Sequence, residues 1–290
     1  ETAKSWEVVH RLLTELIERR TERSGSLVGV GGGVVCDLTA FVASIYARGI
    51  TLILIPTSLL AMVDAALGGK TGIDFGGYKN MVGTFYPADA LVLLPECVAT
   101  LSDREYRSGL AEVIKSALLS DETFVEHLED HGSSLLSREP RVVEEVVRRS
   151  LAVKGKIASE DFREGGGRAV LNLGHTFGHA LEAVTGMSRF THGEAVAWGI
   201  RCATRLSYTQ GRCSAGYLAR VERILDRYGF ERVDLCGTTA QAVDVDRLIA
   251  ALYYDKKSAE GALRFVLQSK VGEQEVVTVT EADVRQVLSH

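Results

Sequence analysis

The sequence has few cysteines, no long apolar run and no excess of basic charge. Its five cysteines are scattered along the chain and form no CxxC pair, which argues against a disulfide framework and against a cysteine zinc site. The same pattern favours a reducing compartment. No apolar segment reaches the length that spans a bilayer, and no basic stretch followed by an apolar run opens the chain. We therefore expect a cytoplasmic protein with no membrane partner.

The charges are nearly balanced, with 33 lysines and arginines against 38 aspartates and glutamates. The resulting net charge of −5 gives no indication of a nucleic-acid partner. It is compatible with an anionic substrate, because a local basic pocket can exist on a mildly acidic protein. Hydrophobic residues make up 46% of the 290 and charged residues 24%. This composition is typical of a folded globular protein with one large or two ordinary domains.

Proline is also scarce, with 4 residues, whereas the 29 glycines gather in short clusters rather than in linkers. In the first third of the chain, strand-like and helical patterns alternate. Strands are expected at residues 26–30, 51–55 and 90–94, and helices at residues 6–20 and 38–46. This alternation indicates a Rossmann-like parallel sheet. We predict an α/β domain over residues 1–101.

The remainder of the chain has a different character. Helical periodicity with few β-branched runs dominates residues 104–228, and residues 263–267 and 275–280 are expected to form a small hairpin. The short apolar run at residues 169–171 looks like a strand. We predict a second, mainly α-helical domain over residues 102–290.

A glycine triplet, Gly31, Gly32 and Gly33, lies between the first predicted strand and the following helix. Glycines in this place let backbone N–H groups approach a pyrophosphate at a helix N-terminus, where the helix dipole favours negative charge. A plain tight turn is the alternative. The GxGxxG fingerprint is absent, and no acidic residue ends a second strand at the usual spacing. The turn therefore favours a dinucleotide bound otherwise than in a standard Rossmann enzyme.

A histidine cluster indicates a metal site. His175 and His179 are four residues apart, hence on one helical face, and His192 follows shortly after. For two histidines alone, the alternative is a buried pair whose ring nitrogens are hydrogen-bonded within the protein. A third histidine favours a divalent metal, and zinc is the natural ion for imidazole and carboxylate ligands. A carboxylate is available at Glu112, which shares a helix face with Lys115. A surface ion pair is the alternative there.

Several cationic or polar residues stand beside glycines or asparagines. Arg48, Lys70 and Arg168 each stand next to a glycine, and Lys79 stands next to an asparagine. Lys154 precedes Arg168 in sequence, and Asn172 lies just before the first histidine. Each alone is commonly a solvated surface residue. Together with a metal site, they predict a pocket for a substrate that carries phosphate and carboxylate groups.

The motifs taken in order resemble those of the 3-dehydroquinate synthases, a family of sugar phosphate cyclases. The resemblance rests on the strings GGGVVCD, PTSLLAMVD, GGKTG, AEVIK, LNLGHTFGHALE and HGEAVA, on Lys79-Asn80, and on the late Asp255-Lys256-Lys257. It runs in order over almost the whole chain. It also implies strands of the NAD domain before Glu1, which this sequence lacks.

The resemblance assigns residues to three groups. The implied metal ligands are Glu112, His175 and His192, so His179 becomes an active-site residue instead of a ligand. The implied NAD contacts are Glu1, Lys4, the turn from Gly33 to Asp37, Thr57, Ser58, Lys70, Lys79 and Thr100. The implied substrate and catalytic residues are Arg48, Asp64, Lys70, Asn80, Lys115, Lys154, Arg168, Asn172, His179 and one or both of Lys256 and Lys257.

The resemblance also implies an activity. Members of the family convert the keto-sugar acid phosphate DAHP into 3-dehydroquinate and phosphate, a step of the shikimate pathway. They use NAD, a divalent metal (Zn²⁺ or Co²⁺) and, we expect, a homodimeric assembly. Their reaction passes through transient oxidation of a hydroxyl, elimination of phosphate, reduction, ring opening and aldol closure. His179 and Asn172 are expected to relay protons from the hydroxyl that is oxidised.

Three other functions remain open at the level of sequence. A cyclase that makes an inosose or a valiolone would lack the substrate carboxylate for which Arg168 is suited. A metal-dependent polyol dehydrogenase would share the glycine turn and the paired histidines, but not the combination of AEVIK and GGKTG. An inactive assembly subunit would have no need to retain a metal ion.

Overall fold

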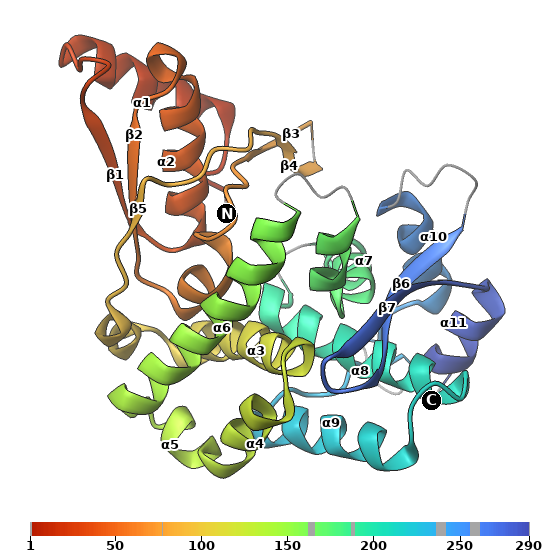
Figure 1. Cartoon of the computed structure of the whole chain (residues 1–290). Helices are drawn as coiled ribbons and strands as arrows, with labels where there is room; N and C mark the ends of the chain where they lie inside the picture. The colour runs from red at the N-terminus through yellow and green to blue at the C-terminus, as the bar shows by residue number, and fades with distance from the viewer. Residues whose placement is uncertain are drawn as a thin grey trace.

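The computed structural model describes residues 2–76, 78–161, 166–186, 189–235, 242–255 and 262–289. Three residues to which the sequence assigns a role, Glu1, Lys256 and Lys257, lie outside the described residues. The chain has an α/β part that contains its first hundred residues and a helical part that follows (Figure 1). Among the described helices, none is both long and apolar enough to cross a membrane.

A parallel sheet forms the centre of the α/β part. Its strands are β1 (Ser26–Gly31), β2 (Thr51–Pro56) and β5 (Ala90–Leu91), hydrogen-bonded in the order β1-β2-β5. The helix α2 (Gly33–Ile45) covers the face that carries Leu52 and Leu54, and α1 (Trp6–Glu18) packs against α2 through Val9. The expected Rossmann-like arrangement of parallel strands and helices is confirmed.

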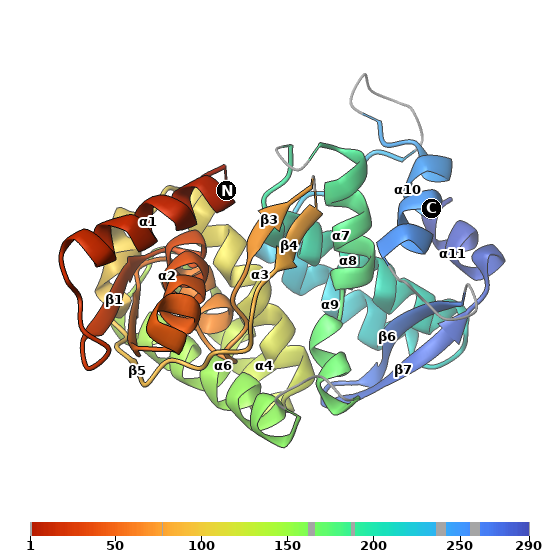
Figure 2. The ribbon, with the colours of Figure 1, turned by 90° about the horizontal axis from the view of Figure 1, so that it is seen from above.

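Short elements lie between the strands of the sheet and before the helical part. They are η1 (Tyr46–Arg48), the π-helix η2 (Ala61–Ala65), the antiparallel hairpin of β3 (Ile73–Phe75) and β4 (Tyr78–Val82), and η3 (Pro95–Thr100). The hairpin lies close to α7 (His175–Val184) of the helical part in two views at right angles (Figures 1 and 2). The hairpin and the π-helix both carry predicted site residues: Lys79 and Asn80 on β4, and Asp64 in η2.

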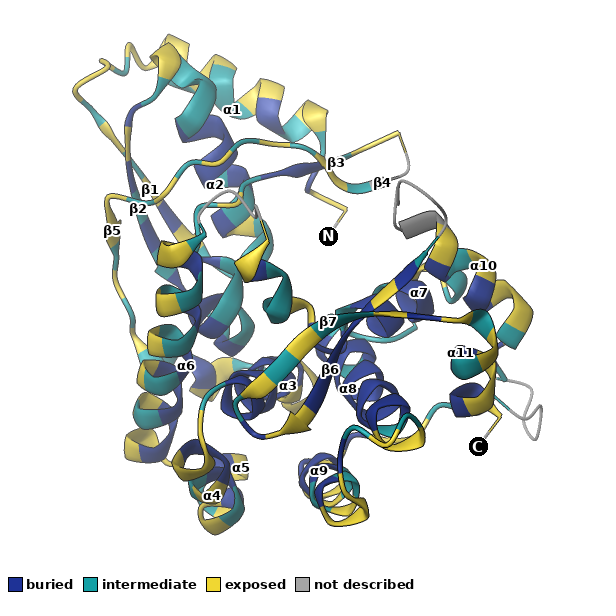
Figure 3. Ribbon diagram, turned by 45° about the vertical axis from the view of Figure 1, so that its right-hand side comes forward, coloured by how far each residue is buried: buried dark blue, intermediate teal, exposed yellow. Residues whose placement is uncertain are grey.

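The helical part is built around two buried helices, α3 (Asp103–Leu119) and α8 (His192–Thr209), which Figure 3 shows almost entirely in the colour of buried residues. The other elements around them are α4 (Glu122–Asp130), α5 (Gly132–Leu136), α6 (Pro140–Glu160), η4 (Gly167–Asn172), α7 (His175–Val184), α9 (Ala215–Arg227), α10 (Val245–Asp255), β6 (Leu263–Lys270), β7 (Glu273–Val279) and α11 (Glu281–Leu288). The antiparallel pairing of β6 with β7 confirms the predicted hairpin.

Local sequence fixes where the two central helices begin. The Ser102 hydroxyl accepts a hydrogen bond from the Glu105 amide at the start of α3. At the start of α8, Thr191 and Glu194 form a reciprocal capping box. The two helices cross closely at Gly193, whose amide donates to the Ser108 hydroxyl at 3.0 Å and where an added Cβ would lie 2.1 Å from the Ser108 carbonyl oxygen. Only glycine fits this crossing, which places His192 next to α3.

Two predicted strands differ in the structure. The third strand of the sheet is only Ala90–Leu91, because its pairing with β2 ends at Leu91, and the chain then continues to η3 at Pro95. Residues 169–171 form part of the 3₁₀ helix η4 instead of a strand, with the amides of Ala169 and Leu173 bonded locally to the carbonyls of Gly166 and Val170. An apolar run of three residues does not distinguish a strand from a helical turn.

Candidate active site

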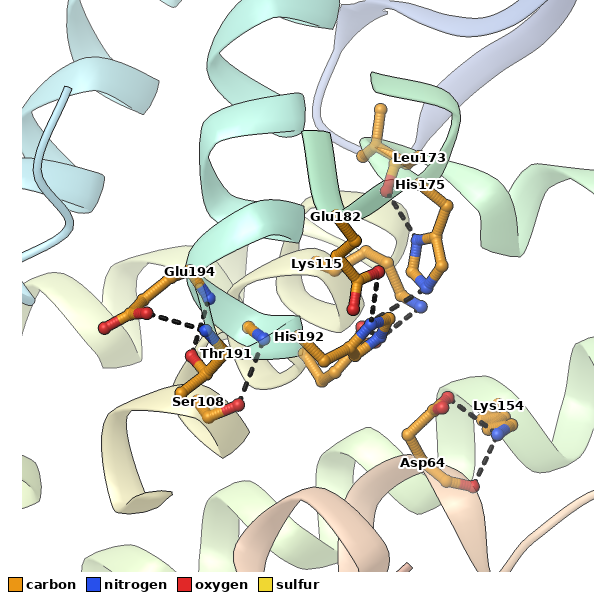
Figure 4. Close-up of polar contacts among 12 residues, drawn as sticks. Asp64, Ser108, Lys115, Lys154, Leu173, His175, Glu182, Thr191, His192 and Glu194 are labelled. Carbon is orange, nitrogen blue, oxygen red and sulfur yellow. Dashed lines mark hydrogen bonds and ion pairs between the residues drawn. The ribbon is translucent and has the colours of Figure 1, made fainter. Parts of the chain in front are cut away.

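Three predicted metal ligands converge from three helices. Glu112 lies in the middle of α3 and is 1% exposed, while His175 and His192 are the first residues of α7 and α8. The Nε2 atoms of His175 and His192 lie 3.4 and 3.5 Å from the Glu112 Oε1 atom. One potential ligand atom from each residue falls within 4.8 Å of the others, and Figure 4 shows both rings directed at this point.

The remaining nitrogen of each ring faces an acceptor. The Nδ1 atom of His175 lies 3.2 Å from the Leu173 carbonyl oxygen, and the Nδ1 atom of His192 lies 3.5 Å from the Glu182 Oε2 atom. An acceptor at Nδ1 favours the tautomer whose proton is on Nδ1 and whose lone pair is on Nε2. Both imidazoles are therefore set to offer Nε2 toward Glu112, as metal-binding histidines do.

The Glu112 carboxylate is deeply buried beside a buried lysine. The Lys115 Nζ atom lies 2.5 Å from Glu112 Oε2, and both side chains are at most 3% exposed, so the alternative of a surface ion pair is wrong. Oε1 lies between the two histidine rings without a well-aligned hydrogen bond. A buried carboxylate oxygen in that situation carries a large desolvation cost, and a cation between Glu112 and the two Nε2 atoms would offset it. The donor set therefore fits a divalent metal.

Electrostatics keep Glu112 and His175 in ligand form, whereas His192 favours the protonated ring, whose Nε2 proton a bound metal would displace. Burial alone would raise the pKa of Glu112, but the charge of Lys115 and the histidine rings holds it well below its usual range. Burial and the charge of Lys115 lower the pKa of His175. Burial would also lower the pKa of His192, yet its contacts with Glu112 and Glu182 raise it to about 10. An anionic Glu112 and a neutral His175 are the protonation states that metal ligation requires.

His179 lies one helical turn beyond His175 on α7. Its ring centroid is 5.4 Å from that of His175 and 6.2 Å from that of His192. It also forms a second group of potential ligands with Glu182 and His192. Because His192 belongs to both groups, the choice of Glu112, His175 and His192 as the ligand set stays a prediction.

A second buried ion pair adjoins the cluster. Lys154 on α6 is 8% exposed, and its ammonium donates to Asp64 Oδ1 at 2.6 Å and to the Asp64 carbonyl oxygen. Asp64 lies in the π-helix η2, a distortion that often marks functional positions. Burial would raise the pKa of Asp64, but Lys154 lowers it below its ordinary value. The charges of Glu112 and Lys115 also act on Asp64, so the two pairs form one electrostatic unit.

Arg168 lies in the 3₁₀ helix η4 and is buried, with only 2% of its surface exposed. Its Nη1 atom donates to the Gly68 carbonyl oxygen at 3.2 Å. Gly68 has a φ of +103°, and a Cβ at this position would lie 2.5 Å from the Arg168 Nη2 atom. The guanidinium thus contacts the glycine-rich GGKTG segment, although 100 residues separate Arg168 from Gly68 in sequence.

The glycine turn and the residues after β2 lie together at the carboxyl ends of the parallel strands. The Thr57 amide donates to the Gly31 carbonyl oxygen at 2.9 Å, and a Cβ on Gly32 would lie 3.4 Å from the Ser58 hydroxyl. The helix α2 begins at Gly33, immediately after the turn. Its N-terminal amides are available to an anion at this edge, which is where open α/β sheets bind their ligands.

Lys4 and Asp37, both assigned to NAD by the resemblance, contact each other. Lys4 is 4% exposed, and its ammonium lies 2.5 Å from Asp37 Oδ2 and also donates to Asn80 Oδ1. Asn80 adopts a positive φ of +52° in the middle of β4, and its amide donates to Asp74 Oδ1. These contacts fasten the N-terminal segment to α2 and to the hairpin.

Other predicted site residues are more exposed. Arg48 in η1 has a positive φ of +66°, and Thr100 in η3 donates its hydroxyl to the Cys97 carbonyl oxygen. Lys70 and Asn172 are also exposed. Their side chains are accessible to a ligand, and their roles stay predictions.

Glu182 is the residue that reasoning from the sequence missed. It is 5% exposed, and its carboxylate contacts both His192 and Lys79. A signal existed, because Glu182 follows His179 by three residues and therefore shares its helix face. It lies within the HALE string, to which only a family resemblance had been assigned.

A cavity of about 810 Å³ lies elsewhere, between the end of α6, the start of η4 and the β6–β7 turn. Its lining includes Lys156, Asp161, Val170 and Gln274 but none of Glu112, His175 or His192. The candidate active site is therefore defined by its converging side chains and not by this hollow.

Comparison with known proteins identifies the family. A model of the 3-dehydroquinate synthase N-terminal region matches residues 1–108, and a model of the 3-dehydroquinate synthase C-terminal region matches residues 109–258. The 3-dehydroquinate synthase of Nitrosomonas europaea is 44% identical over 272 residues, which cover 94% of this chain and 72% of the relative. That of Dichelobacter nodosus is 43% identical over 290 residues, which cover 100% of this chain and 77% of the relative.

Solved structures agree in fold. The 2-epi-5-epi-valiolone synthase ValA from Streptomyces hygroscopicus, with NAD⁺ and Zn²⁺ bound, has a TM-score of 0.90 at 29% identity, over 100% of this chain and 79% of that one. A 2-deoxy-scyllo-inosose synthase in complex with carbaglucose-6-phosphate, NAD⁺ and Co²⁺ has a TM-score of 0.89 at 25% identity, over 99% and 80%. A probable glycerol dehydrogenase from Sinorhizobium meliloti, with a TM-score of 0.64 and 18% identity over 98% and 80%, shares the fold alone. With both family models matched and relatives above 40% identity along the chain, this protein belongs to the 3-dehydroquinate synthase family.

Proposed function

We propose that this chain catalyses the conversion of DAHP into 3-dehydroquinate and phosphate. The observation that carries the proposal is the convergence of Glu112, His175 and His192 beside a buried Lys115. The family match along the chain supports the same reaction.

The proposed cofactors are NAD and a divalent metal. Glu112, His175 and His192 would hold the metal, and the turn after β1, with Gly33, Thr57 and Ser58 close to it, would hold the pyrophosphate of NAD. The metal would polarise the hydroxyl that is oxidised, and NAD would accept and return the hydride. Zn²⁺ with NAD⁺ in the valiolone synthase, and Co²⁺ with NAD⁺ in the inosose synthase, support this assignment.

The charged residues around the metal cluster would bind the substrate. Lys115 and Lys154 lie within one electrostatic unit with Asp64, where a phosphate or carboxylate can compete for their ammonium groups. Arg168 presents a planar fork that suits a carboxylate. His179, next to His175 and on the same helix face, would move a proton from the reacting hydroxyl, with Asn172 nearby in sequence.

The second candidate function is a cyclase that acts on a sugar phosphate without a carboxylate. The closeness in fold of the valiolone synthase, at a TM-score of 0.90, favours it. Identities of 43–44% with 3-dehydroquinate synthases, against 29% with the valiolone synthase, favour DAHP. The buried Arg168 is the residue at which the two candidates should differ.

We also propose that the protein is a homodimer. Within the chain, the α/β domain would end at residue 101 and the helical domain would begin at residue 102. The setting would be the cytoplasm. Cys36, Cys97, Cys202 and Cys213 are free thiols, which supports a reducing compartment.

The test compares two substrates in the presence of NAD and zinc. Phosphate release should be faster from DAHP than from a sugar phosphate of the same length that lacks the carboxylate. Faster phosphate release from the second compound would favour a cyclase of the valiolone type. Accumulation of NADH during turnover, without phosphate, would instead indicate a polyol dehydrogenase.

A further inference from the structure

The carboxylate of Glu182 lies between the metal cluster and the β3–β4 hairpin. It projects from α7, one helical turn beyond His179, and is 5% exposed. Its two oxygens have different partners: Oε2 lies 3.5 Å from His192 Nδ1, and Oε1 lies 3.2 Å from Lys79 Nζ. A buried carboxylate is costly unless it is paired on both sides, so these contacts account for its charge at this position.

His192 needs this acceptor more than His175 does. The Nδ1 atom of His175 is held by the Leu173 carbonyl oxygen, which belongs to the backbone just before α7. His192 is the first residue of α8, and its Nδ1 faces the side chain of Glu182 (Figure 4). The orientation and tautomer of the His192 ring therefore depend on a side chain from a different helix.

Lys79 connects Glu182 to the hairpin that also carries Asn80. Lys79 is on β4, and 103 residues separate it from Glu182 in sequence. The Glu182 side chain is 6% exposed, and that of Lys79 is 30% exposed. The pair thus links the α/β part to the helix that presents His175.

We propose that Glu182 is a positioning residue for His192, and that Lys79 acts on the metal site through Glu182. This inference rests on the proposed metal site at Glu112, His175 and His192. The Glu182 carboxylate accepts the Nδ1 proton of His192, so that the Nε2 lone pair points at Glu112. Lys79 holds the carboxylate in the rotamer that reaches His192. Acceptors of this kind typically change metal affinity about 10–100-fold when they are removed.

A role for Glu182 as a metal ligand is the competing interpretation, since it forms a group with His179 and His192. The His192 atom nearest to Glu182 is Nδ1, at 3.5 Å from Oε2, which argues against it because the proposed ligand atom of His192 is Nε2. In addition, both imidazole Nε2 atoms face Glu112 rather than Glu182.

The experiment measures zinc affinity of the full chain by competition with a chromogenic chelator, without NAD or substrate. Glu182→Ala should weaken zinc binding about 10–100-fold. Glu182→Gln, which retains an acceptor oxygen, should restore much of the affinity. Glu222→Ala on α9, which removes a carboxylate paired with Arg205, is the matched control and should bind zinc like the unmodified protein. Circular dichroism of the metal-free variants checks that each one folds.

Two further variants test the route through Glu182. Lys79→Met should weaken zinc binding less than Glu182→Ala does, and the double variant should match Glu182→Ala alone, because Lys79 has no effect without the carboxylate. The visible absorption of bound Co²⁺ should shift in Glu182→Ala but not in Glu222→Ala. Additive losses in the double variant would contradict the proposed route.

The outcomes separate this inference from the proposed function. If the unmodified protein binds zinc and Glu182→Ala binds it equally well, the positioning role is wrong and the proposed function stands. If Glu182→Ala and His179→Ala lose zinc while His175→Ala keeps it, Glu182 is a ligand and the inference is overturned. If the unmodified protein binds neither zinc nor cobalt, both the inference and the proposed function are wrong.

Discussion

Lys154 on α6 is hydrogen-bonded to Asp64 in η2 twice, to the side-chain oxygen at 2.6 Å and to the backbone carbonyl oxygen. The contact spans 90 residues of sequence and joins the α/β part to the helical part. It also holds the π-helix against α6. The pair is therefore both a structural tie and a supply of positive charge next to the metal cluster.

Lys154→Met should destabilise the protein, because it leaves the Asp64 carboxylate without its partner. Loss of one member of a buried pair costs about 3–5 kcal/mol, and we expect about 2–3 kcal/mol here since 27% of the Asp64 side chain is exposed. Urea unfolding followed by circular dichroism gives the free energy of unfolding. Lys156→Met, an exposed lysine on the same helix, is the control and should change it by less than about 0.5 kcal/mol.

The Asp64 carboxyl should make stability depend on acid pH. Its pKa is lowered in the folded protein relative to the ordinary value of 3.8, so the unfolded chain binds the proton more readily. The resulting stabilisation is fully present above the unfolded pKa and is lost as the pH falls through the folded pKa. The difference in unfolding free energy between the unmodified protein and Asp64→Asn should therefore shrink below about pH 4. A constant difference from pH 3 to 7 would contradict this linkage.

Two histidines on adjacent helices should respond differently to truncation. His192→Ala removes a proposed ligand, so bound metal and activity should be lost together. His179→Ala should retain metal and lose most turnover, by about 100-fold or more, the typical contribution of a general acid or base. Metal content by atomic emission and phosphate release from DAHP measure the two properties on the same samples. A metal-free His179→Ala protein would instead favour the group of His179, Glu182 and His192.

Arg168→Lys should impair substrate selection more than folding. A lysine keeps the charge but not the planar fork, so it cannot make two parallel hydrogen bonds to a carboxylate. We expect kcat/KM for DAHP to fall by the equivalent of about 2–4 kcal/mol of transition-state binding free energy. The loss should be much smaller for a sugar phosphate without the carboxylate. Equal losses for both compounds would show that Arg168 is not the carboxylate clamp.

The sequence predicted correctly those features that depend on residues close together in the chain. The periodicity around Glu112 and Lys115 predicted a helix with both residues on one face, and the structure has them there in contact. The spacing of His175 and His179 predicted one helical face, which α7 provides. These features depend only on the 3.6-residue period of a helix.

Features that depend on distant contacts could not be predicted. Burial of Arg168 follows from its contact with the backbone of Gly68, and nothing in the sequence around either residue indicates that they meet. The link from Lys79 to Glu182 likewise depends on where the hairpin comes to rest. The length of the third strand was overestimated because periodicity marks an apolar run, whereas a strand ends where its pairing ends.

The central claim is tested most directly by the product formed from DAHP. The protein is stripped of metal, then incubated with DAHP and NAD, with and without added zinc, and the products are followed by proton NMR together with phosphate release. The account predicts 3-dehydroquinate and phosphate in equal amounts with zinc, little of either without it, and no net NADH. Zinc-bound protein that holds NAD and leaves DAHP unchanged would contradict it.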